Sequence, residues 1–293
     1  MNTDDWQIVR HLIADQTGQR IGDLEVMSVS GGDINSAWRL RDGKHVFFCK
    51  TNQSKCLAMF EAEQHGLEEI QRSGGIRVPH PIGCGIVGDQ AFMVMEFVDL
   101  SGRVDESKLA RGIATMHLCT REKFGFALDN TIGSTPQPNA YESDWVKFWQ
   151  QNRLGFQLSL AKKNGCSGEL FETGMQLNQH IDELFPDYLP VPSLLHGDLW
   201  SGNQGADATG KPVIYDPACY YGDHEADLAM MELFGRPGEL FFSVYREVFP
   251  IDDGYSVRRN LYNLYHILNH ALLFGGAYRV QAQRMIDNLR SQM

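Results

Sequence analysis

A short run of polar side chains in the second half of the chain has the composition of a phosphoryl-transfer site. Asp198 and Asn203 lie in the run LHGDLWSGN, residues 195–203, and Asp216 follows the next apolar run. In phosphoryl transfer one carboxylate orients the acceptor hydroxyl and takes its proton, while amide and carboxylate oxygens bind Mg²⁺ on the phosphates. One such residue alone would indicate an ordinary polar turn. The ordered set predicts Asp198 as catalytic base and Asn203 and Asp216 as metal ligands.

Two kinds of supporting residue are expected around this catalytic loop. Trp200 lies between Asp198 and Asn203, where its ring is either a core side chain or a stacking surface for the acceptor, and the loop position favours stacking. One acid of the run YYGDHEADL, residues 220–228, is expected to bond the loop backbone, and we assign this role to Asp227. His196 is grouped with Asp227 as structural support of the loop.

The first half of the chain supplies a lysine at a strand end and glutamates on the segment that follows. The ammonium group of Lys50 would contact the phosphates of a nucleotide if an ion pair with a helix glutamate positioned it. Glu63 is the predicted partner, because Gly66 and Leu67 place an apolar contact about one turn further along. Glu61 is an adjacent competitor. The alternative for Lys50 and Glu63 is a solvated position without a role in binding.

A glycine-containing turn precedes the lysine. Gly31 and Gly32 separate two extended runs, and their backbone N–H groups could cover the phosphates of a nucleotide. A two-glycine turn is more often only a turn, and the chain has no G-x-x-x-x-G-K-[ST] phosphate loop. Asp33 would repel phosphates if it faced them, so we expect it to point away or to bond the turn backbone.

The elements that position these residues follow from the spacing of apolar side chains. Residues 4–16 have helical spacing, with Thr3 or Asp4 available as the cap. Extended runs follow on either side of a hairpin signal at Asp42-Gly43, and Lys50 ends the returning strand. A helix over roughly 54–72 and an antiparallel pair, 83–87 with 91–98, complete a small sheet with one long helix.

After Ser101 the chain becomes mainly helical. Candidate helices cover residues 105–119, 141–164, 168–185, 225–233, 238–248 and a long stretch 254–290. Short strands are expected around 193–196 and 213–216, and an irregular insertion over 129–140. His266 and His270 lie at helical spacing among apolar residues, which predicts core or groove side chains rather than ligands.

This change of pattern predicts an α+β fold with two lobes, in agreement with a length of 293 residues. We expect residues 1–95 to form the N-lobe, residues 96–100 the boundary, and residues 101–293 the C-lobe with the catalytic loop, metal site and acceptor site.

Composition excludes several classes of partner and compartment. The net charge of −11 repels nucleic acid and anionic membrane. The six cysteines lack metal-ligand spacing and are expected to be free thiols. The acidic N-terminus lacks the apolar region of a signal peptide, and no apolar run reaches the length of a membrane span. We therefore expect a cytoplasmic protein.

Several segments resemble the fructosamine kinase or ketosamine-3-kinase family, part of the protein-kinase-like and aminoglycoside-phosphotransferase-like superfamily. The most specific are LHGDLWSGN at 195–203 and DPACYYGDHEADLAM at 216–230. Weaker segments are TPQPN at 135–139, DW at 144–145, RL at 153–154, FEAE at 60–63 and GL at 66–67. Together they extend along nearly the whole chain. The resemblance implies a two-lobed protein-kinase-like fold.

The resemblance also implies an activity: ATP-dependent phosphorylation, with Mg²⁺, of the 3-hydroxyl of a ketosamine such as fructosamine or ribulosamine. The substrate would be a small molecule or a glycated protein, and phosphorylation would promote release of the amine. The same roles follow for Asp198, Asn203 and Asp216, with Lys50 and Glu63 as phosphate clamp and Trp200 against the sugar. The hinge whose backbone binds adenine would consist of Met95, Glu96, Phe97 and Val98.

Some relatives carry a cysteine in the glycine turn that joins two chains, whereas this chain has Asp33 there. A redox-switched dimer is therefore not expected, and we predict a monomer or weak dimer. A kinase of another hydroxylated molecule, such as an aminoglycoside, choline or a sugar, remains the alternative, because the acidic charge suits any cationic acceptor. A nucleotide-binding pseudokinase is disfavoured, since Lys50, Asp198, Asn203 and Asp216 are all present.

Overall fold

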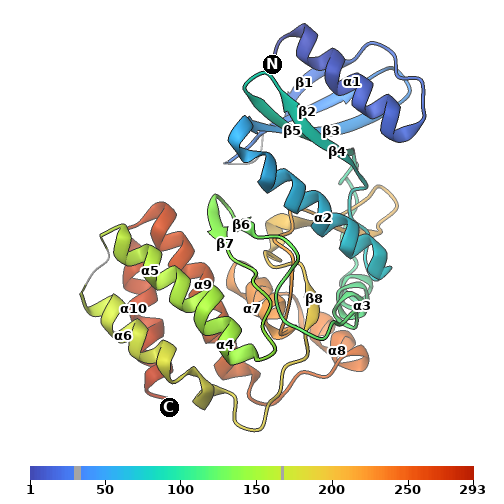
Figure 1. Ribbon diagram of the computed structural model, residues 1–293. Helices are drawn as coiled ribbons and strands as arrows, with labels where there is room; N and C mark the ends of the chain where they lie inside the picture. The colour runs from blue at the N-terminus through green and yellow to red at the C-terminus, as the bar shows by residue number, and fades with distance from the viewer. Residues whose placement is uncertain (30–33, 166–167) are drawn as a thin grey trace.

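The N-lobe is built around a five-stranded antiparallel sheet with strand order β1-β2-β3-β5-β4 (Figure 1). The computed structural model describes residues 1–29, 34–165 and 168–293. The strands are β1 (Glu25–Val29), β2 (Ser36–Arg41), β3 (Val46–Gln53), β4 (Pro81–Val87) and β5 (Gln90–Glu96). The predicted hairpin at Asp42-Gly43 joins β2 to β3, where Gly43 has a φ of 90° and the Asp42 N–H donates to the His45 carbonyl.

The two faces of this sheet pack against different helices, α1 (Thr3–Thr17) and α2 (Leu57–Ser73). Strand β5 alternates: Phe92 and Val94 pack with Val9 and Ile13 of α1, while Met93 and Met95 belong to the core that contains residues of α2. Because successive side chains of a strand point to opposite faces, the residue of β3 opposite Met93 points toward α2. That residue is Lys50.

The helix predicted over 4–16 is confirmed, but its cap is different. Asn2 precedes α1, and its side chain accepts a hydrogen bond from the Asp5 N–H at 3.0 Å while the Asp5 carboxylate accepts from the Asn2 N–H. This reciprocal capping box satisfies N–H groups that neither Thr3 nor Asp4 would reach from inside the helix. The helix predicted over 54–72 begins as a 3₁₀ turn, Ser54–Cys56, before α2.

The C-lobe is mainly helical (Figure 1). Its helices are α3 (Glu106–His117), α4 (Trp145–Trp149), α5 (Gly155–Lys163), α6 (Glu169–Gln179), α7 (Glu225–Leu233), α8 (Glu239–Val248), α9 (Tyr255–Phe274) and α10 (Ala277–Arg290). A π-helical turn, Gln150–Leu154, joins α4 to α5, and 3₁₀ turns lie at Ile181–Leu184 and Ser201–Asn203. Helix α9 lies at the centre of the lobe, where it packs against α7, α5 and α10.

Short strands interrupt these helices and frame the catalytic loop. They are β6 (Asn130–Ile132), β7 (Thr135–Gln137), β8 (Ser193–Leu195), β9 (Gln204–Ala206), β10 (Pro212–Ile214) and β11 (Tyr220–Gly222). Strand β8 pairs with β11, and β9 pairs with β10, all antiparallel. The prediction of an irregular insertion over 129–140 is wrong in part, because β6 and β7 form a hairpin there.

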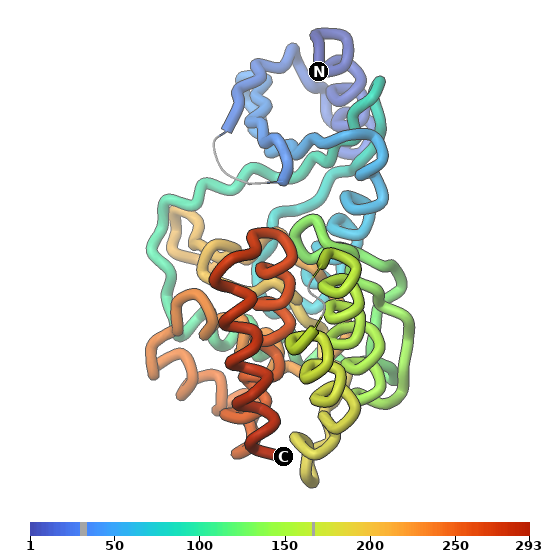
Figure 2. The backbone as a smooth tube through the Cα atoms, turned by 90° about the vertical axis from the view of Figure 1, so that its left-hand side faces the viewer, coloured from blue at the N-terminus to red at the C-terminus, as the bar shows by residue number. Residues whose placement is uncertain are grey.

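The long helix predicted over 254–290 is two antiparallel helices. Gly275 and Gly276 have φ values of 65° and 56°, in the left-handed region that glycine adopts without a steric penalty. The break lets α10 fold back along α9, and Figure 2 shows their turn at the end of the C-lobe that faces the N-lobe. Apolar periodicity continues across the break, which is why spacing alone did not show it.

No helix in the described ranges is both long enough and apolar enough to cross a membrane.

Candidate functional site

The catalytic loop leaves β8 at His196 and is held by a buried carboxylate on α7. Asp227 Oδ2 accepts the His196 N–H at 2.7 Å, and Asp227 Oδ1 accepts the Gly197 N–H at 2.9 Å. Gly197 has a φ of 82°, and a side-chain carbon there would lie 2.1 Å from the Ala218 carbonyl oxygen. His196 Nε2 lies 3.0 Å from the Tyr215 carbonyl oxygen. The backbone hydrogen bonds predicted for Asp227 are thus present, and the His196 side chain links the loop to the backbone at Tyr215.

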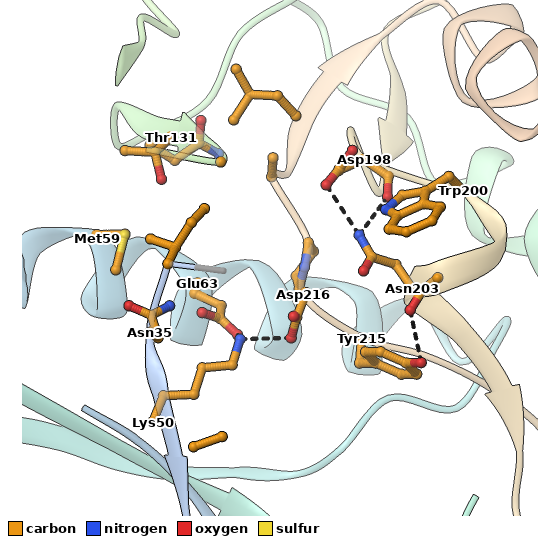
Figure 3. Close-up of a pocket in the computed structure, with 18 of the residues that line it drawn as sticks. Asn35, Lys50, Met59, Glu63, Thr131, Asp198, Trp200, Asn203, Tyr215 and Asp216 are labelled. Carbon is orange, nitrogen blue, oxygen red and sulfur yellow. Dashed lines mark hydrogen bonds and ion pairs between the residues drawn. The ribbon is translucent and has the colours of Figure 1, made fainter. Parts of the chain in front are cut away.

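Asp198 and Asn203 face each other across this loop (Figure 3). The amide nitrogen of Asn203 donates to the Asp198 carbonyl oxygen at 2.9 Å and to Asp198 Oδ2 at 3.1 Å. Burial, and the nearby charges of Asp216 and Asp227, raise the pKa of Asp198 to about 7 against the opposing effect of the Asn203 hydrogen bond. The side chain is therefore poised to exchange a proton near neutral pH.

Asp216 projects into the same space from the segment after β10. Its φ of 59° is unusual for a residue with a side chain, and Asp is among the few types that tolerate it. Oδ1 of Asp216 lies 2.6 Å from Lys50 Nζ, although the two residues belong to different lobes. The Asp216 side chain is 47% exposed. One carboxylate oxygen of Asp216 therefore pairs with Lys50, while the Asp216 side chain remains accessible from the cleft.

Lys50 and Glu63 form the ion pair that the sequence predicted. Lys50 Nζ is 2.6 Å from Glu63 Oε1, and both side chains are almost fully buried. Glu61, the competitor on the same helix, is exposed. Burial acts to lower the pKa of Lys50, but the carboxylates of Glu63 and Asp216 outweigh it and raise that pKa. Lys50 is therefore a permanent cation at the point where the lobes meet.

Helix α2, which carries Glu63, is anchored to the C-lobe. A side-chain carbon at Gly66 would lie 3.0 Å from Cys219 Sγ, so glycine lets α2 approach the segment after β10 closely. One turn further, the buried Glu69 accepts hydrogen bonds from the Tyr221 hydroxyl at 2.6 Å and from Arg121 at 2.9 Å. These contacts fix the height and rotation of α2, and with them the position of Glu63.

These groups open into one cleft of about 1140 Å³ between the lobes. The predicted hinge residues Met95, Glu96, Phe97 and Val98 all line the cleft. The Glu96 side chain is held by Arg77 at 2.5 Å. The other predicted nucleotide-covering residues, Gly31 and Gly32, lie outside the described residues, as does Asp33.

Trp200 lines the cleft next to Asp198 and is 36% exposed. Its ring folds back over the loop, since a side-chain carbon at Gly202 would lie 2.2 Å from it. The ring of Phe234 meets it edge to face, with centroids 6.2 Å apart. Trp200 is thus a cleft-lining residue rather than a core residue, and its stacking against an acceptor stays a prediction.

The oxygen atoms of Asn203 and Asp216 fit a hard cation such as Mg²⁺. The Asn203 amide nitrogen is turned toward Asp198 by two hydrogen bonds, which leaves its carbonyl oxygen on the other side. Among the described residues no hydrogen bond reaches that oxygen, and Lys50 occupies one oxygen of Asp216. A carboxylate and an amide oxygen are the ligand types that Mg²⁺ uses beside phosphate oxygens and water.

Several cleft residues had no assigned role in the sequence. The β6–β7 hairpin contributes Thr131, Gly133 and Ser134, and α7 is followed by Phe234. His266 and His270 also line the cleft, in agreement with the prediction of groove residues. No local motif marks the hairpin or Phe234, because their position depends on how the C-lobe helices pack.

Comparison with known proteins extends over almost the whole chain. The profile of the fructosamine kinase family matches residues 5–292. A protein of Synechocystis sp. named probable ketoamine kinase is 43% identical over 96% of this chain and 95% of its own length. The chloroplastic protein-ribulosamine 3-kinase of Arabidopsis thaliana is 45% identical over 90% of this chain and 82% of its own length.

Solved structures agree with the sequence relatives. A crystal structure assigned as a fructosamine-3-kinase of Haemophilus somnus superimposes with a TM-score of 0.89 at 29% identity, over 97% of both chains. The aminoglycoside phosphotransferase APH(4)-Ia superimposes with a TM-score of 0.58 at 15% identity, over 98% of this chain and 99% of its own. The latter likeness shows the fold alone. The expected two-lobed, protein-kinase-like α+β fold is therefore confirmed.

Proposed function

The chain belongs to the fructosamine kinase family, and on that premise we propose that it transfers the γ-phosphate of ATP to the 3-hydroxyl of a ketosamine. Fructosamine and ribulosamine adducts are the proposed acceptors, as free small molecules or on glycated proteins. The proposal draws support from relatives named for ketoamine and ribulosamine kinase activity. Phosphorylation at this position would promote loss of the sugar from the amine.

The observation that carries the proposal is the meeting of five groups in one cleft. Two come from the N-lobe, Lys50 and Glu63, and three from the C-lobe, Asp198, Asn203 and Asp216 (Figure 3). Their order and spacing supply a phosphate-binding cation, a proton acceptor and oxygen ligands, which are the parts that phosphoryl transfer requires. A pseudokinase would be expected to lack at least one of them.

In the proposed mechanism, catalysis consists mainly of positioning and electrostatics. The carboxylate of Asp198 orients the acceptor hydroxyl and takes its proton, and Asn203 holds that carboxylate in place. Lys50, fixed by Glu63, neutralises charge on the phosphates. Asn203 and Asp216 would hold Mg²⁺, which when bound shields the negative charge of the phosphates.

The charges that line the cleft favour an acceptor with a neutral sugar over a polycation. The acids among the lining residues in the described ranges are Glu63, Glu96, Asp198 and Asp216. Lys50 engages Glu63 and Asp216, and Arg77 engages Glu96. Asp198 is left as the one acid of this set without a basic partner. An aminoglycoside with several ammonium groups would need more negative charge for electrostatic complementarity.

The division of the chain follows from the same proposal. Residues 1–95 act as the lobe that covers the nucleotide, residues 96–100 as the hinge, and residues 101–293 as the lobe that binds metal and acceptor. Met95 to Val98 would bind adenine through the backbone, because Arg77 already engages the side chain of Glu96. We propose that the active unit is a monomer or weak dimer.

A substrate screen tests the proposal directly. ATP consumption is measured with fructosamine, ribulosamine and erythrulosamine derivatives, beside aminoglycosides, choline and free sugars. Mass spectrometry with fragmentation then locates the phosphate. Turnover of a ketosamine with phosphate at the 3-hydroxyl is the expected result. Efficient phosphorylation of an aminoglycoside or choline, with none of any ketosamine, would overturn it.

A further inference from the structure

A chain of aromatic rings leads from the catalytic loop to the C-terminal end of α9, where the chain turns into α10. We call Trp200, Phe234, His270, Phe274 and Tyr278 the aromatic track. Ring centroids are 6.2 Å apart for Trp200 and Phe234, 5.0 Å for Phe234 and His270, and 5.5 Å for His270 and Phe274. Tyr278 of α10 lies 5.1 Å from His270 and 6.2 Å from Phe274. Successive rings are thus in contact.

The track is accessible from the cleft. Trp200, Phe234, His270 and Phe274 all line the cleft that contains Asp198. Phe274 is 63% exposed, although it is a large apolar side chain. It ends α9 at the turn that faces the N-lobe (Figure 2). Exposed aromatic rings that border a binding cleft are favourable positions for ligand contact.

Among the described cleft-lining residues, no free positive charge competes with a cation at the track. Burial lowers the pKa of His270, which keeps this imidazole neutral at physiological pH. Lys50 is the only lysine or arginine among the cleft-lining residues of the described ranges, and two carboxylates already hold it.

We propose that the aromatic track binds the protonated secondary amine and alkyl chain of an N-substituted ketosamine. The inference rests on the proposed function and assigns the part of the acceptor that lies beyond the sugar. With the sugar hydroxyl at Asp198, the amine and its substituent extend past Trp200 toward Phe234 and Phe274. Ring faces attract an ammonium group through their negative quadrupole and also cover the aliphatic chain.

On this proposal, the aromatic track lets a cleft with few free carboxylates select a ketosamine over a free ketose. Both share the hydroxyl that receives the phosphate, but only the ketosamine carries an ammonium group. A cation–π contact discriminates between them without a salt bridge. The alkyl chain of a modified lysine would leave the protein along Phe274, where the cleft meets solvent.

The affinities of two matched ligands test this inference without any measurement of turnover. The first is 1-deoxy-1-(butylamino)fructose, and the second is its ether analogue, in which oxygen replaces the amine nitrogen. Affinities for the full-length protein are measured by calorimetry in the presence of a non-hydrolysable ATP analogue and Mg²⁺. We expect the amine to bind about tenfold more tightly than the ether. Equal affinities for the wild-type protein would overturn the proposal without any variant.

Substitutions at Phe274 separate the cation–π contribution from simple apolar contact. Phe274→Leu keeps an apolar side chain but removes the ring, and should reduce the preference for the amine about threefold. Phe274→Tyr keeps the ring and should preserve the preference. Tyr141→Ala removes an exposed aromatic side chain that does not line this cleft, and serves as the matched control. A preference that Phe274→Leu leaves intact would count against the track.

Turnover with the same two ligands distinguishes the inference from the proposed function. If the amine binds through Phe274 but no phosphate is transferred to it, the track stands and the ketosamine kinase proposal falls. If amine and ether are phosphorylated and bound equally well, the proposed activity on the sugar stands and the track falls.

Discussion

Asn203 binds Asp198 twice through a single amide nitrogen, at the backbone carbonyl oxygen (2.9 Å) and at the carboxylate oxygen Oδ2 (3.1 Å). The first contact closes the loop between the two residues, and the second orients the carboxylate. This arrangement joins the proposed proton acceptor to a proposed metal ligand. Displacement of either side chain would therefore disturb both functions.

Asp198→Asn is expected to retain ATP binding and lose turnover. The amide has the same shape as the carboxylate but cannot take the proton of the substrate hydroxyl, so kcat should fall by about 10²–10⁴-fold. A coupled ADP assay measures turnover, and calorimetry measures nucleotide affinity. Asp182→Asn, at an exposed acid on a C-lobe 3₁₀ turn, is the control. Wild-type kcat for Asp198→Asn would refute its role as base.

Glu63→Gln is expected to weaken the use of ATP, whereas Glu61→Gln is expected to have no effect. The substituted amide would keep the shape of Glu63 but lose the charge that holds Lys50, so kcat/KM for ATP should fall about tenfold or more. Glu61 is exposed on the same helix and supplies a matched control. Steady-state kinetics with varied ATP measure both variants. Equal losses for the two would contradict the assignment of Glu63.

Asp216→Asn is expected to reduce the affinity for Mg-ATP and to remove most of its dependence on Mg²⁺. Asparagine tolerates the φ of 59° at this position, so the backbone is preserved while the charged oxygen ligand is lost. The affinity for Mg-ATP should fall about tenfold or more. Calorimetry with and without Mg²⁺ measures the effect. An unchanged Mg²⁺ dependence would show that Asp216 does not bind the metal.

His224 is expected to make the stability of the protein sensitive to acid. Its buried ring stacks on Phe249 at 4.1 Å, and burial, with the charges of His117 and Arg258, lowers its pKa to about 3. In the unfolded chain His224 binds a proton below about pH 6.5, whereas in the folded chain it does not do so until about pH 3. The stability that the neutral, packed His224 ring contributes is therefore complete above pH 6.5. It decreases as the pH falls below 6.5, because protonation of His224 then favours the unfolded chain.

The His224→Gln variant isolates that contribution. Loss of the packed ring should make it less stable than the wild type at pH 8, by about 1–3 kcal/mol. The difference should narrow below pH 6.5, with a slope of up to about 1.4 kcal/mol per pH unit. Urea unfolding between pH 5 and pH 8 measures both curves. A difference that stays constant over this range would exclude His224 as the titrating group.

Much of the catalytic loop was predictable from sequence, because its contacts are local. Asp198 and Asn203 lie within one loop, and a bond between them requires only a short turn. The hairpin at Asp42-Gly43 and the bounds of α7 were also correct, since each is marked by a turn residue or by regular apolar spacing. The glycine break between α9 and α10 was missed, because two glycines do not by themselves end an apolar pattern.

The choice between Glu61 and Glu63 required the tertiary structure. Both acids lie on α2, and the face that points to Lys50 depends on how Phe60, Gly66 and Glu69 pack that helix against the sheet and the C-lobe. The contact of Lys50 with Asp216 joins residues 166 positions apart. No local pattern encodes such a contact.

The sequence by itself determined which chemical groups are present and their order along the chain: Lys50, then Asp198, Asn203 and Asp216. Only the tertiary structure decided that they share one cleft, that Glu63 holds the lysine, and that aromatic rings from the catalytic loop, the segment after α7, and helices α9 and α10 form one track beside them. The physical reason is that side-chain type and short spacing are local properties. Proximity between distant segments is set instead by the burial of many apolar side chains at once.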